Sequence, residues 1–117
     1  MSHILSKDRV VLIQSVEVAH TFLRRFAGLM LRKPLPPGHA MLITPCHSIH
    51  TCFMRFSLDV FFLDHGNRVV KICRRVRPFR LASGGRQARS VLEMTSDWLA
   101  PDALHTGDIV ELRDSKD

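Results

Sequence analysis

The stretch LDVFFLDHGNRVVKICRRV, residues 58–76, decides the fold. Two apolar, β-rich runs, 58–64 and 68–76, flank the turn sequence HGN, in which Gly66 and Asn67 tolerate positive φ. This pattern predicts an antiparallel hairpin. The first run is apolar at odd and even positions alike, so we expect a central strand that is covered on both faces of its sheet.

Four more runs have the β-branched and apolar composition of strands. They lie at 9–19, 41–44, 90–94 and 108–112. Short loops and hairpins join runs of this kind, so strands dominate the expected fold. We therefore predict an α+β domain with a mainly antiparallel sheet, which forms either a curled sheet or a small barrel-like domain.

Helical structure is expected in two places. Phe22, Phe26, Leu29 and Met30 are spaced as on one face of a short amphipathic helix within 20–32. The three prolines that follow this segment exclude a helix or a central strand and predict a surface loop. A helical turn, interrupted by a proline, is expected just before the last strand.

The length and the N-terminus limit the class of protein. The 117 residues suffice for a single domain, 1–117, whose core we place at about 9–113. No apolar run approaches the roughly 20 residues of a membrane-spanning helix, and the N-terminus lacks the order of a secretory signal. We expect a cytoplasmic protein without a membrane partner. Its three cysteines, an odd number, are then expected to be free thiols.

The net charge of +6 is unevenly distributed. A segment without Asp or Glu carries eight basic residues: Arg68, Lys71, Arg74, Arg75, Arg77, Arg80, Arg86 and Arg89. Such a segment favours an anionic partner, although a solvated sheet face has the same composition. We select Arg74, Arg75 and Arg77 as candidate ligand-binding residues. A nucleic acid is a weaker candidate, because the exposed aromatic residues that stack on single strands are not evident.

The segment SIHTCFMRF, 48–56, gives the central strand a polar start. Charged Arg55 and Asp59 beside an apolar strand need solvent or an ion pair, so they are either a structural pair or part of a site. We expect His50, Arg55 and Asp59 at the rim of a concavity, with Cys52 and Met54 buried behind it. In that site Arg55 would bind an anion, which His50 and Asp59 would orient.

Two other chemistries are weighed for the same segment. Cys46, His50 and Cys52 are soft ligands that suit a metal, but structural zinc sites usually show two ligand pairs and only one cluster exists here. We therefore predict no metal and no cofactor. A hydrolase around His50, Arg55 and Asp59 stays an alternative, although the chain has no nucleophile elbow, phosphate loop or paired carboxylates. Whether any reaction is catalysed stays open.

Several pieces of the chain, taken in order, resemble one known family. They are RFAGLM, GHAML, IHTCFMRFSLDVFFLD, VLEM and LHTGDIVEL, and the similarity runs from about Val10 to Arg113. Together they resemble the domain-of-unknown-function family 192 of bacteria and archaea. The matching positions include Gly28, Leu29, Met30, His50, Thr51, Met54, Asp59, Gly107 and Asp108. The resemblance implies a small, mainly β domain of the α+β class and brings no established activity.

These observations lead to one expected function. The chain is predicted to be a non-catalytic binding module for a small or polymeric anion. Its expected ligand-binding residues are His50, Arg55, Asp59, Arg74, Arg75 and Arg77.

Overall fold

The computed structural model of the chain describes residues 3–114, and in it the predicted hairpin is present. Strands β5 (Leu58–Leu63) and β6 (Val69–Val76) pair antiparallel. In the turn between them, Asn67 has a φ of 60°, and the Asp64 carboxylate accepts backbone hydrogen bonds from Arg68 and Gly66 at 2.9 Å each. These bonds lower the pKa of Asp64.

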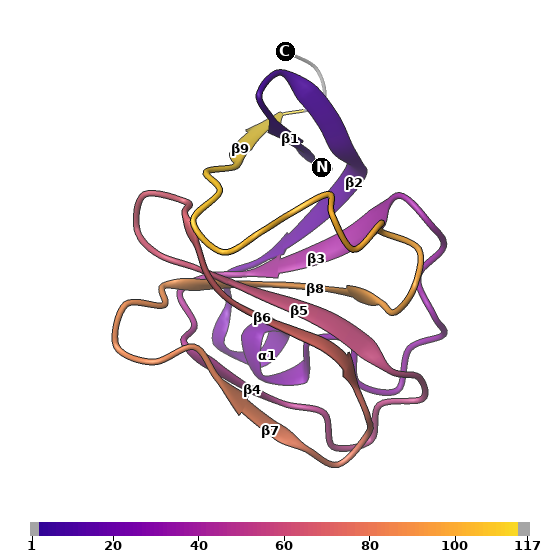
Figure 1. Cartoon of the computed structure of the whole chain (residues 1–117). Coiled ribbons are helices and arrows are strands. Elements are labelled where there is room, and N and C mark those ends of the chain that lie inside the picture. Colours follow the sequence, from indigo (N-terminus) through magenta and orange to yellow (C-terminus); the bar gives the residue numbers. More distant parts are fainter. Residues whose placement is uncertain (1–2, 115–117) are drawn as a thin grey trace.

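Seven strands form one mixed sheet in the order β6-β5-β8-β3-β2-β1-β9. The strands outside the hairpin are β1 (His3–Lys7), β2 (Val10–Ala19), β3 (His39–Ile43), β8 (Ser90–Thr95) and β9 (Glu111–Asp114). Figure 1 shows the end formed by β1, β2 and β9 turned away from the other strands. The sheet is therefore curled but not closed, since β6 and β9 are its edges. Strand β5 pairs with β6 and β8, and each of its residues is buried, which confirms the expected interior strand covered on both faces.

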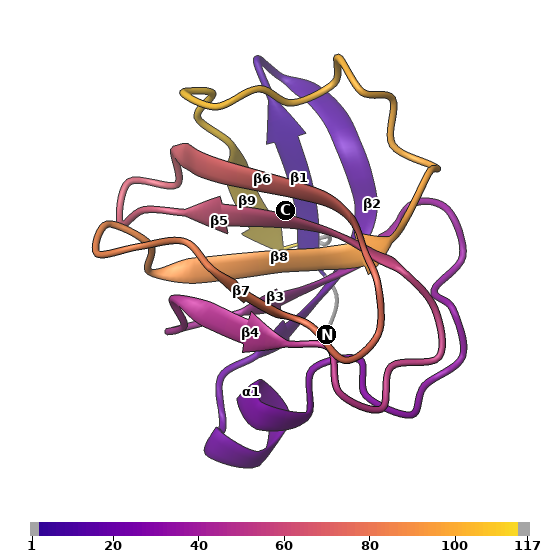
Figure 2. The same cartoon turned by 60° about the horizontal axis from the view of Figure 1, so that its bottom comes forward.

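One helix and a second, small sheet lie outside the large sheet. Helix α1 (Phe22–Ala27) begins after Thr21, whose hydroxyl accepts the backbone N–H of Arg24 at 3.3 Å. Strands β4 (Ser48–His50) and β7 (Leu81–Ser83) pair antiparallel. Figure 2 shows α1 and the β4–β7 pair on the same side of the large sheet. No helix among residues 3–114 has the length and apolar character needed to cross a membrane.

Alternating side chains along β3, β8 and β5 divide the interior into two apolar clusters. The first includes Leu42, Leu92 and Phe61, and it packs against residues from the segment 96–110. The second includes Met41, Val91, Val60 and Phe62, and it packs against Leu29 and the β4–β7 pair. Both faces of the central strands are thus covered, as the apolar pattern of β5 predicts.

Three details of the predicted fold are corrected. The sheet contains one parallel pair, β2 with β3, because the chain crosses over through α1 before it returns. The prediction of a helical turn at 95–107 is wrong, since the structure has non-helical turns there. Asp97 has a φ of 77°, which a right-handed helix does not allow, and Pro101 has no N–H to donate to a helical hydrogen bond. Strands β1, β4 and β7 were not expected from the sequence.

Asp59 faces the first cluster, on the same side of β5 as Phe61, and has a structural role. Two residues of β6, Arg74 and Arg75, lie opposite Asp59 alone, which makes a β-bulge. The buried Asp59 carboxylate accepts the backbone N–H of Arg75 at 3.0 Å and that of Asp97 at 3.4 Å. It also forms an ion pair with Nη1 of Arg74 at 3.1 Å. One carboxylate therefore joins β5, β6 and the loop after β8.

We predict that Asp59→Asn lowers the free energy of unfolding by about 2–3 kcal/mol, because it removes the charge from three partly buried hydrogen bonds. Asp97→Asn makes the same chemical change in an exposed ion pair with Arg75 and should cost under about 1 kcal/mol. Urea unfolding measures both values. Equal losses in the two variants would contradict the role given to Asp59.

Candidate functional site

Among the described residues, one buried carboxyl group faces the second cluster, from β8, an interior strand of the large sheet. Glu93 of β8 pairs with Met41 of β3 on one side and with Val60 of β5 on the other. Its side chain is 1% exposed, and its Oε1 has no hydrogen-bond partner among the described residues. Loss of solvent raises the pKa of Glu93 to about 8. The group is therefore a neutral carboxylic acid at pH 7.

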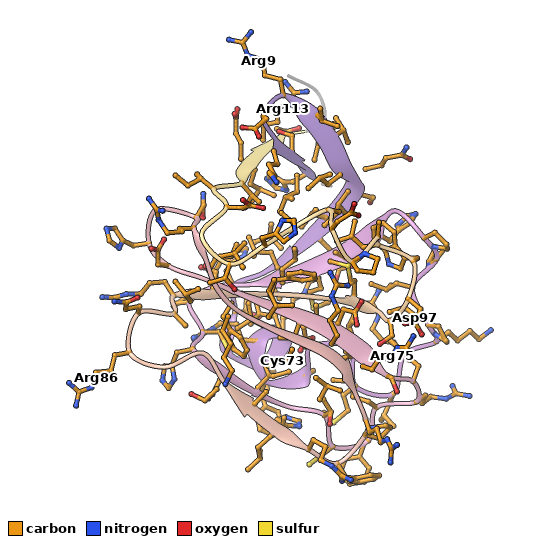
Figure 3. The ribbon with its side chains drawn as sticks, viewed as in Figure 1. Arg9, Cys73, Arg75, Arg86, Asp97 and Arg113 are labelled. Carbon is orange, nitrogen blue, oxygen red and sulfur yellow. The ribbon has the colours of Figure 1, made fainter. Side chains whose placement is uncertain are left out.

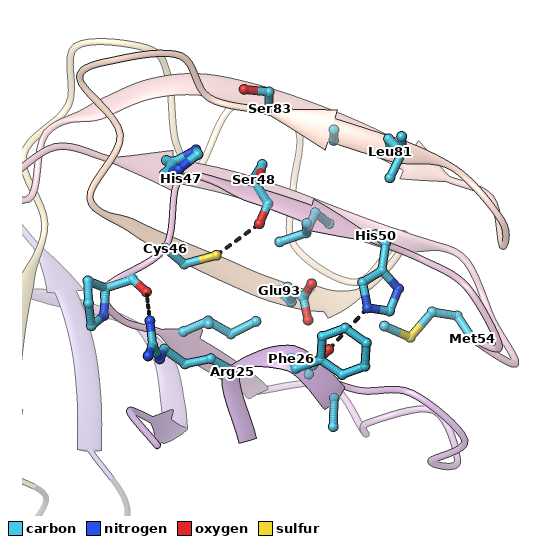
Figure 4. A pocket seen from close by; sticks show the side chains of 16 residues that line it. Arg25, Phe26, Cys46, His47, Ser48, His50, Met54, Leu81, Ser83 and Glu93 are labelled. Atoms are coloured by element: carbon cyan, nitrogen blue, oxygen red, sulfur yellow. Dashed lines mark hydrogen bonds between the residues drawn. The ribbon is translucent and has the colours of Figure 1, made fainter. Parts of the chain in front are cut away.

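Glu93 lines a cavity of about 750 Å³, which we call the Glu93 pocket. Figure 4 shows its carboxyl group pointing into the space between α1 and β4. The other walls include Ile43, Ile49 and Met54, so the lining of the pocket is mainly apolar. Small-molecule sites commonly combine an apolar wall with a few placed polar groups.

Gly28 keeps the space beside the carboxyl group open. The residue ends α1 at a φ of 51°, a conformation that favours glycine. A Cβ atom at this position would lie 3.0 Å from Oε1 of Glu93 and 3.5 Å from Cδ1 of Ile43. Because Gly28 has no side chain, it can adopt the positive φ that ends α1, and it leaves space beside Oε1 of Glu93.

His50 joins the two walls of the pocket. Its Nδ1 accepts the backbone N–H of Cys52 at 3.2 Å, so the neutral ring carries its proton on Nε2, which donates to the carbonyl of Phe26 at 3.1 Å. The ring centroids of His50 and Phe26 are 5.1 Å apart. Both nitrogens of His50 are thus engaged, and the ring ties β4 to α1.

Arg25 and Cys46 lie at the other side of the pocket. Nη1 of Arg25 donates to the carbonyl of Pro45 at 2.9 Å, while its buried Nε has no partner among the described residues. The Cys46 thiol donates to the carbonyl of Ser48 at 2.9 Å, and burial raises the pKa of this thiol. A neutral, hydrogen-bonded thiol is a poor nucleophile.

A second cavity of about 720 Å³, the arginine hollow, adjoins the Glu93 pocket. The two cavities share five lining residues: Arg25, Pro45, Cys46, His47 and Ser83. Arg86 and Arg89 line the hollow, and none of the described carboxylates does. Arg25 therefore stands between an apolar pocket and a basic one.

The structure separates the residues that the sequence analysis grouped into one site. His50 and the buried Met54 line the Glu93 pocket, and Cys52 is half-buried. Asp59 lies in the other cluster, because odd and even positions of β5 face opposite sides of the sheet. Arg55 is exposed and does not line either cavity. His50, Arg55 and Asp59 therefore do not share either of these two cavities in the part of the chain that the structure describes.

The basic strand residues are also placed outside both cavities. Arg74 forms the ion pair with Asp59, and Arg75 pairs with Asp97 at 2.8 Å. Figure 3 shows Arg75 and Asp97 together, far from Arg86. Arg77 is exposed. Ligand binding by Arg74, Arg75 and Arg77 stays a prediction.

The sequence analysis missed Glu93, Arg25, Arg86 and Arg89 as site residues. One signal for Glu93 was available: a lone acid within the apolar strand sequence SVLEM. Such an acid is either buried with a partner or placed at a site. Arg86 and Arg89 had no local signal, since they were part of a long basic segment.

Metal ligation has no geometric support within the described chain. Among residues 3–114, no three His, Cys, Asp or Glu side chains lie together as a metal site requires. The alternative ligand set of Cys46, His50 and Cys52 therefore does not form a site there. All three cysteines are free, as the odd count predicted.

Comparisons with known proteins agree on one family. The family model DUF192, described as Uncharacterized ACR, matches residues 3–112. A UPF0127 protein of Pyrococcus abyssi is 39% identical over 84 residues, which make up 67% of this chain and 68% of that protein. A UPF0127 protein of Pyrococcus furiosus is 30% identical over 112 residues, with 92% of this chain and 93% of that protein covered.

A solved structure has the same fold. It is a protein of unknown function from Novosphingobium aromaticivorans DSM 12444, with a TM-score of 0.81 and 21% sequence identity. The similarity covers 95% of this chain and 84% of that chain. At this identity the likeness shows the fold alone.

We predict a pH dependence of stability that Glu93 causes. The folded-state pKa of about 8 exceeds the ordinary value of 4.5, so the unfolded chain loses this proton first as the pH rises. The protonated Glu93 therefore contributes its full share to the free energy of unfolding below about pH 4.5, and this share is lost as the pH rises to about 8. The loss is on the order of a few kcal/mol. Glu93→Gln removes the titration and should remain stable over this window.

Urea unfolding at about pH 5, 7 and 9 measures this effect. Glu111→Gln, on an exposed position of β9, is the matched control and should follow the wild-type profile. A Glu93→Gln profile that runs parallel to the wild type would show that the carboxyl group does not titrate differently in the folded state.

Proposed function

The chain belongs to the DUF192 family of uncharacterized proteins, and we propose that this member is a binding module for a small organic anion. The ligand occupies the Glu93 pocket with an apolar body and the arginine hollow with its anionic group. The observation that carries the proposal is the buried Glu93 carboxyl group, which faces an open, mainly apolar cavity and whose Oε1 has no partner within residues 3–114.

An unpaired buried polar atom costs about 1–3 kcal/mol, and buried polar side chains are normally hydrogen-bonded. A ligand that donates to Oε1 of Glu93 would supply the missing bond. The protonated carboxyl group can also donate one hydrogen bond. The pocket therefore suits a ligand that presents a hydroxyl, amide or similar group at the end of an apolar body.

The arginine hollow supports an anionic group at the other end of this ligand. Guanidinium groups bind carboxylates and phosphates through two parallel hydrogen bonds. Arg86 and Arg89 supply such groups, and the free Nε of Arg25 lies at the boundary with the Glu93 pocket. The two adjoining cavities, of about 750 and 720 Å³, have the size of small-molecule sites, which favours a small anion over a polymeric one.

Several features favour binding over a hydrolytic reaction. The Cys46 thiol is neutral and donates to a carbonyl, and both ring nitrogens of His50 are used in holding the walls together. Asp59, which a hydrolase around His50 would need, lies across the sheet. We therefore assign Glu93 a role in recognising the ligand.

The proposal is tested with 8-anilinonaphthalene-1-sulfonate, which combines an apolar ring system with one sulfonate. We expect Arg86→Ala with Arg89→Ala to weaken binding about tenfold and to flatten its salt dependence, since each lost ion pair contributes on the order of 1 kcal/mol. Ala82→Trp, in the wall of the Glu93 pocket, should abolish binding by filling the cavity. Isothermal titration calorimetry gives the affinity and stoichiometry.

Arg9→Ala with Arg113→Ala is the matched control, because it removes the same charge from the far end of the molecule (Figure 3). This control should bind the probe like the wild type. If both double variants weaken binding equally, only the net charge matters and the arginine hollow is not the anion site.

A further inference from the structure

Five large apolar side chains are exposed around the outer mouth of the Glu93 pocket and in the loops beside it. This aromatic patch consists of Phe26 (59% exposed), Leu31 (67%), Phe53 (58%), Phe79 (60%) and Leu81 (84%). Exposed apolar patches on a folded chain commonly mark interaction surfaces. Phe26 and Leu81 line the Glu93 pocket, so the patch and the pocket meet.

The five side chains come from segments that contact one another. The backbone N–H of Leu31 donates to the carbonyl of Phe53 at 3.1 Å. The rings of Phe53 and Phe79 pack edge to face with centroids 5.6 Å apart. His50 connects the remaining two, because its ring lies against Phe26 and its backbone pairs with Leu81.

Three residues of the patch have a backbone conformation that bulky side chains rarely adopt. The φ values are 63° at Leu31, 61° at Phe53 and 62° at Phe79. Left-handed backbone costs roughly 1–2 kcal/mol for a residue with a Cβ atom, and glycine or asparagine would lower this cost. Since these side chains are mostly exposed, core packing does not offset the strain. Strain of this kind is a mark of functional segments.

The strained segments are held rigidly rather than left loose. Thr51 is buried, and its hydroxyl donates to the carbonyl of Arg77 at 2.6 Å and accepts the backbone N–H of Arg80 at 2.8 Å. The carbonyl of Thr51 accepts the backbone N–H groups of Met54 and Phe79 at 3.1 and 2.9 Å. One threonine thus fixes both loops that present the phenylalanines.

The surroundings of the patch are basic. Arg55, Arg77 and Arg80 are exposed next to Phe53 and Phe79 in sequence, and none of the three has a carboxylate partner among residues 3–114. The chain has no Asp or Glu between Glu17 and Asp59, nor between Asp64 and Glu93. The patch therefore combines protruding apolar groups with uncompensated positive charge.

We propose that the aromatic patch docks the protein onto an anionic lipid surface. Phenylalanine and leucine side chains enter the interface between headgroups and acyl chains, while arginines beside them attract anionic headgroups, at about 1 kcal/mol each. Single-stranded nucleic acid shares the charge requirement, but the aliphatic Leu31 and Leu81 have no ring on which bases stack. This docking is independent of the ligand in the Glu93 pocket and requires no spanning helix.

Co-sedimentation with vesicles tests the proposal. The wild type should bind vesicles of phosphatidylcholine mixed with phosphatidylglycerol and not vesicles of phosphatidylcholine alone. Phe53→Asn with Phe79→Asn should weaken vesicle binding at least about tenfold, which is roughly 1.4 kcal/mol. Because asparagine tolerates a left-handed backbone, the melting temperature of this variant should not fall.

Val10→Asn with Ile109→Asn is the matched control. It removes two exposed apolar side chains that lie outside the patch, and it should bind vesicles like the wild type. Equal binding to both vesicle types, or no difference between the two double variants, would overturn the proposal. A third outcome would also overturn it. In that outcome neither the wild type nor the Phe53→Asn, Phe79→Asn variant binds vesicles, and the wild type binds a fluorescent oligothymidine that the variant does not bind. That result would assign the patch to nucleic acid.

Discussion

The alternation of side chains across β3, β8 and β5 governs the rest of the structure. These three strands are hydrogen-bonded neighbours and are buried on both faces, so each successive residue enters a different apolar cluster. A shift of one residue in any of them would exchange the two clusters. The register therefore decides which polar side chain meets the segment 96–110 and which one meets α1 and β4.

Two buried carboxyl groups show the consequence of this register. Asp59 of β5 and Glu93 of β8 are each about 1% exposed. Asp59 faces the first cluster, where a bulge in β6 and the loop after β8 supply three donors. Glu93 enters the second cluster, where burial raises its pKa and nothing in the described chain bonds its Oε1. One acid thus holds strands together, while the other is available to a ligand.

The sequence predicts the parts of the fold that depend on local pattern. The hairpin 58–76, the central position of β5, the strand at 9–19 and the turn at Asn67 follow from apolar alternation and turn chemistry. Short strands such as β4 and β7 carry too few residues to show a period, so they could not be recognised. Parallel pairing of β2 with β3 depends on a crossover, which local patterns do not report.

The site was harder to predict because its residues are distant in sequence. Alternate residues of a strand share one face, so Asp59 lies on the same face of β5 as Phe61. This alternation argues against grouping Asp59 with the Glu93 pocket on the opposite face. The Glu93 pocket, however, also needs α1, β4 and β7, which only tertiary contacts bring together. His50 was recognised as a site residue, but its role as a link between walls depends on the carbonyl of Phe26, 24 residues away.

Strained backbone positions elsewhere in the chain give the contrast that makes the aromatic patch informative. Arg75 also has a positive φ, 53°, but its N–H bonds to Asp59 and its guanidinium group to Asp97, so contacts within the fold offset the strain. Phe53 and Phe79 have similar φ values, yet their rings contact each other and face outward. An edge-to-face pair contributes about 0.5–1.5 kcal/mol, which does not exceed the cost of two left-handed residues. The ring pair therefore does not offset the strain, and the hydrogen bonds of Thr51 hold the two loops in this conformation.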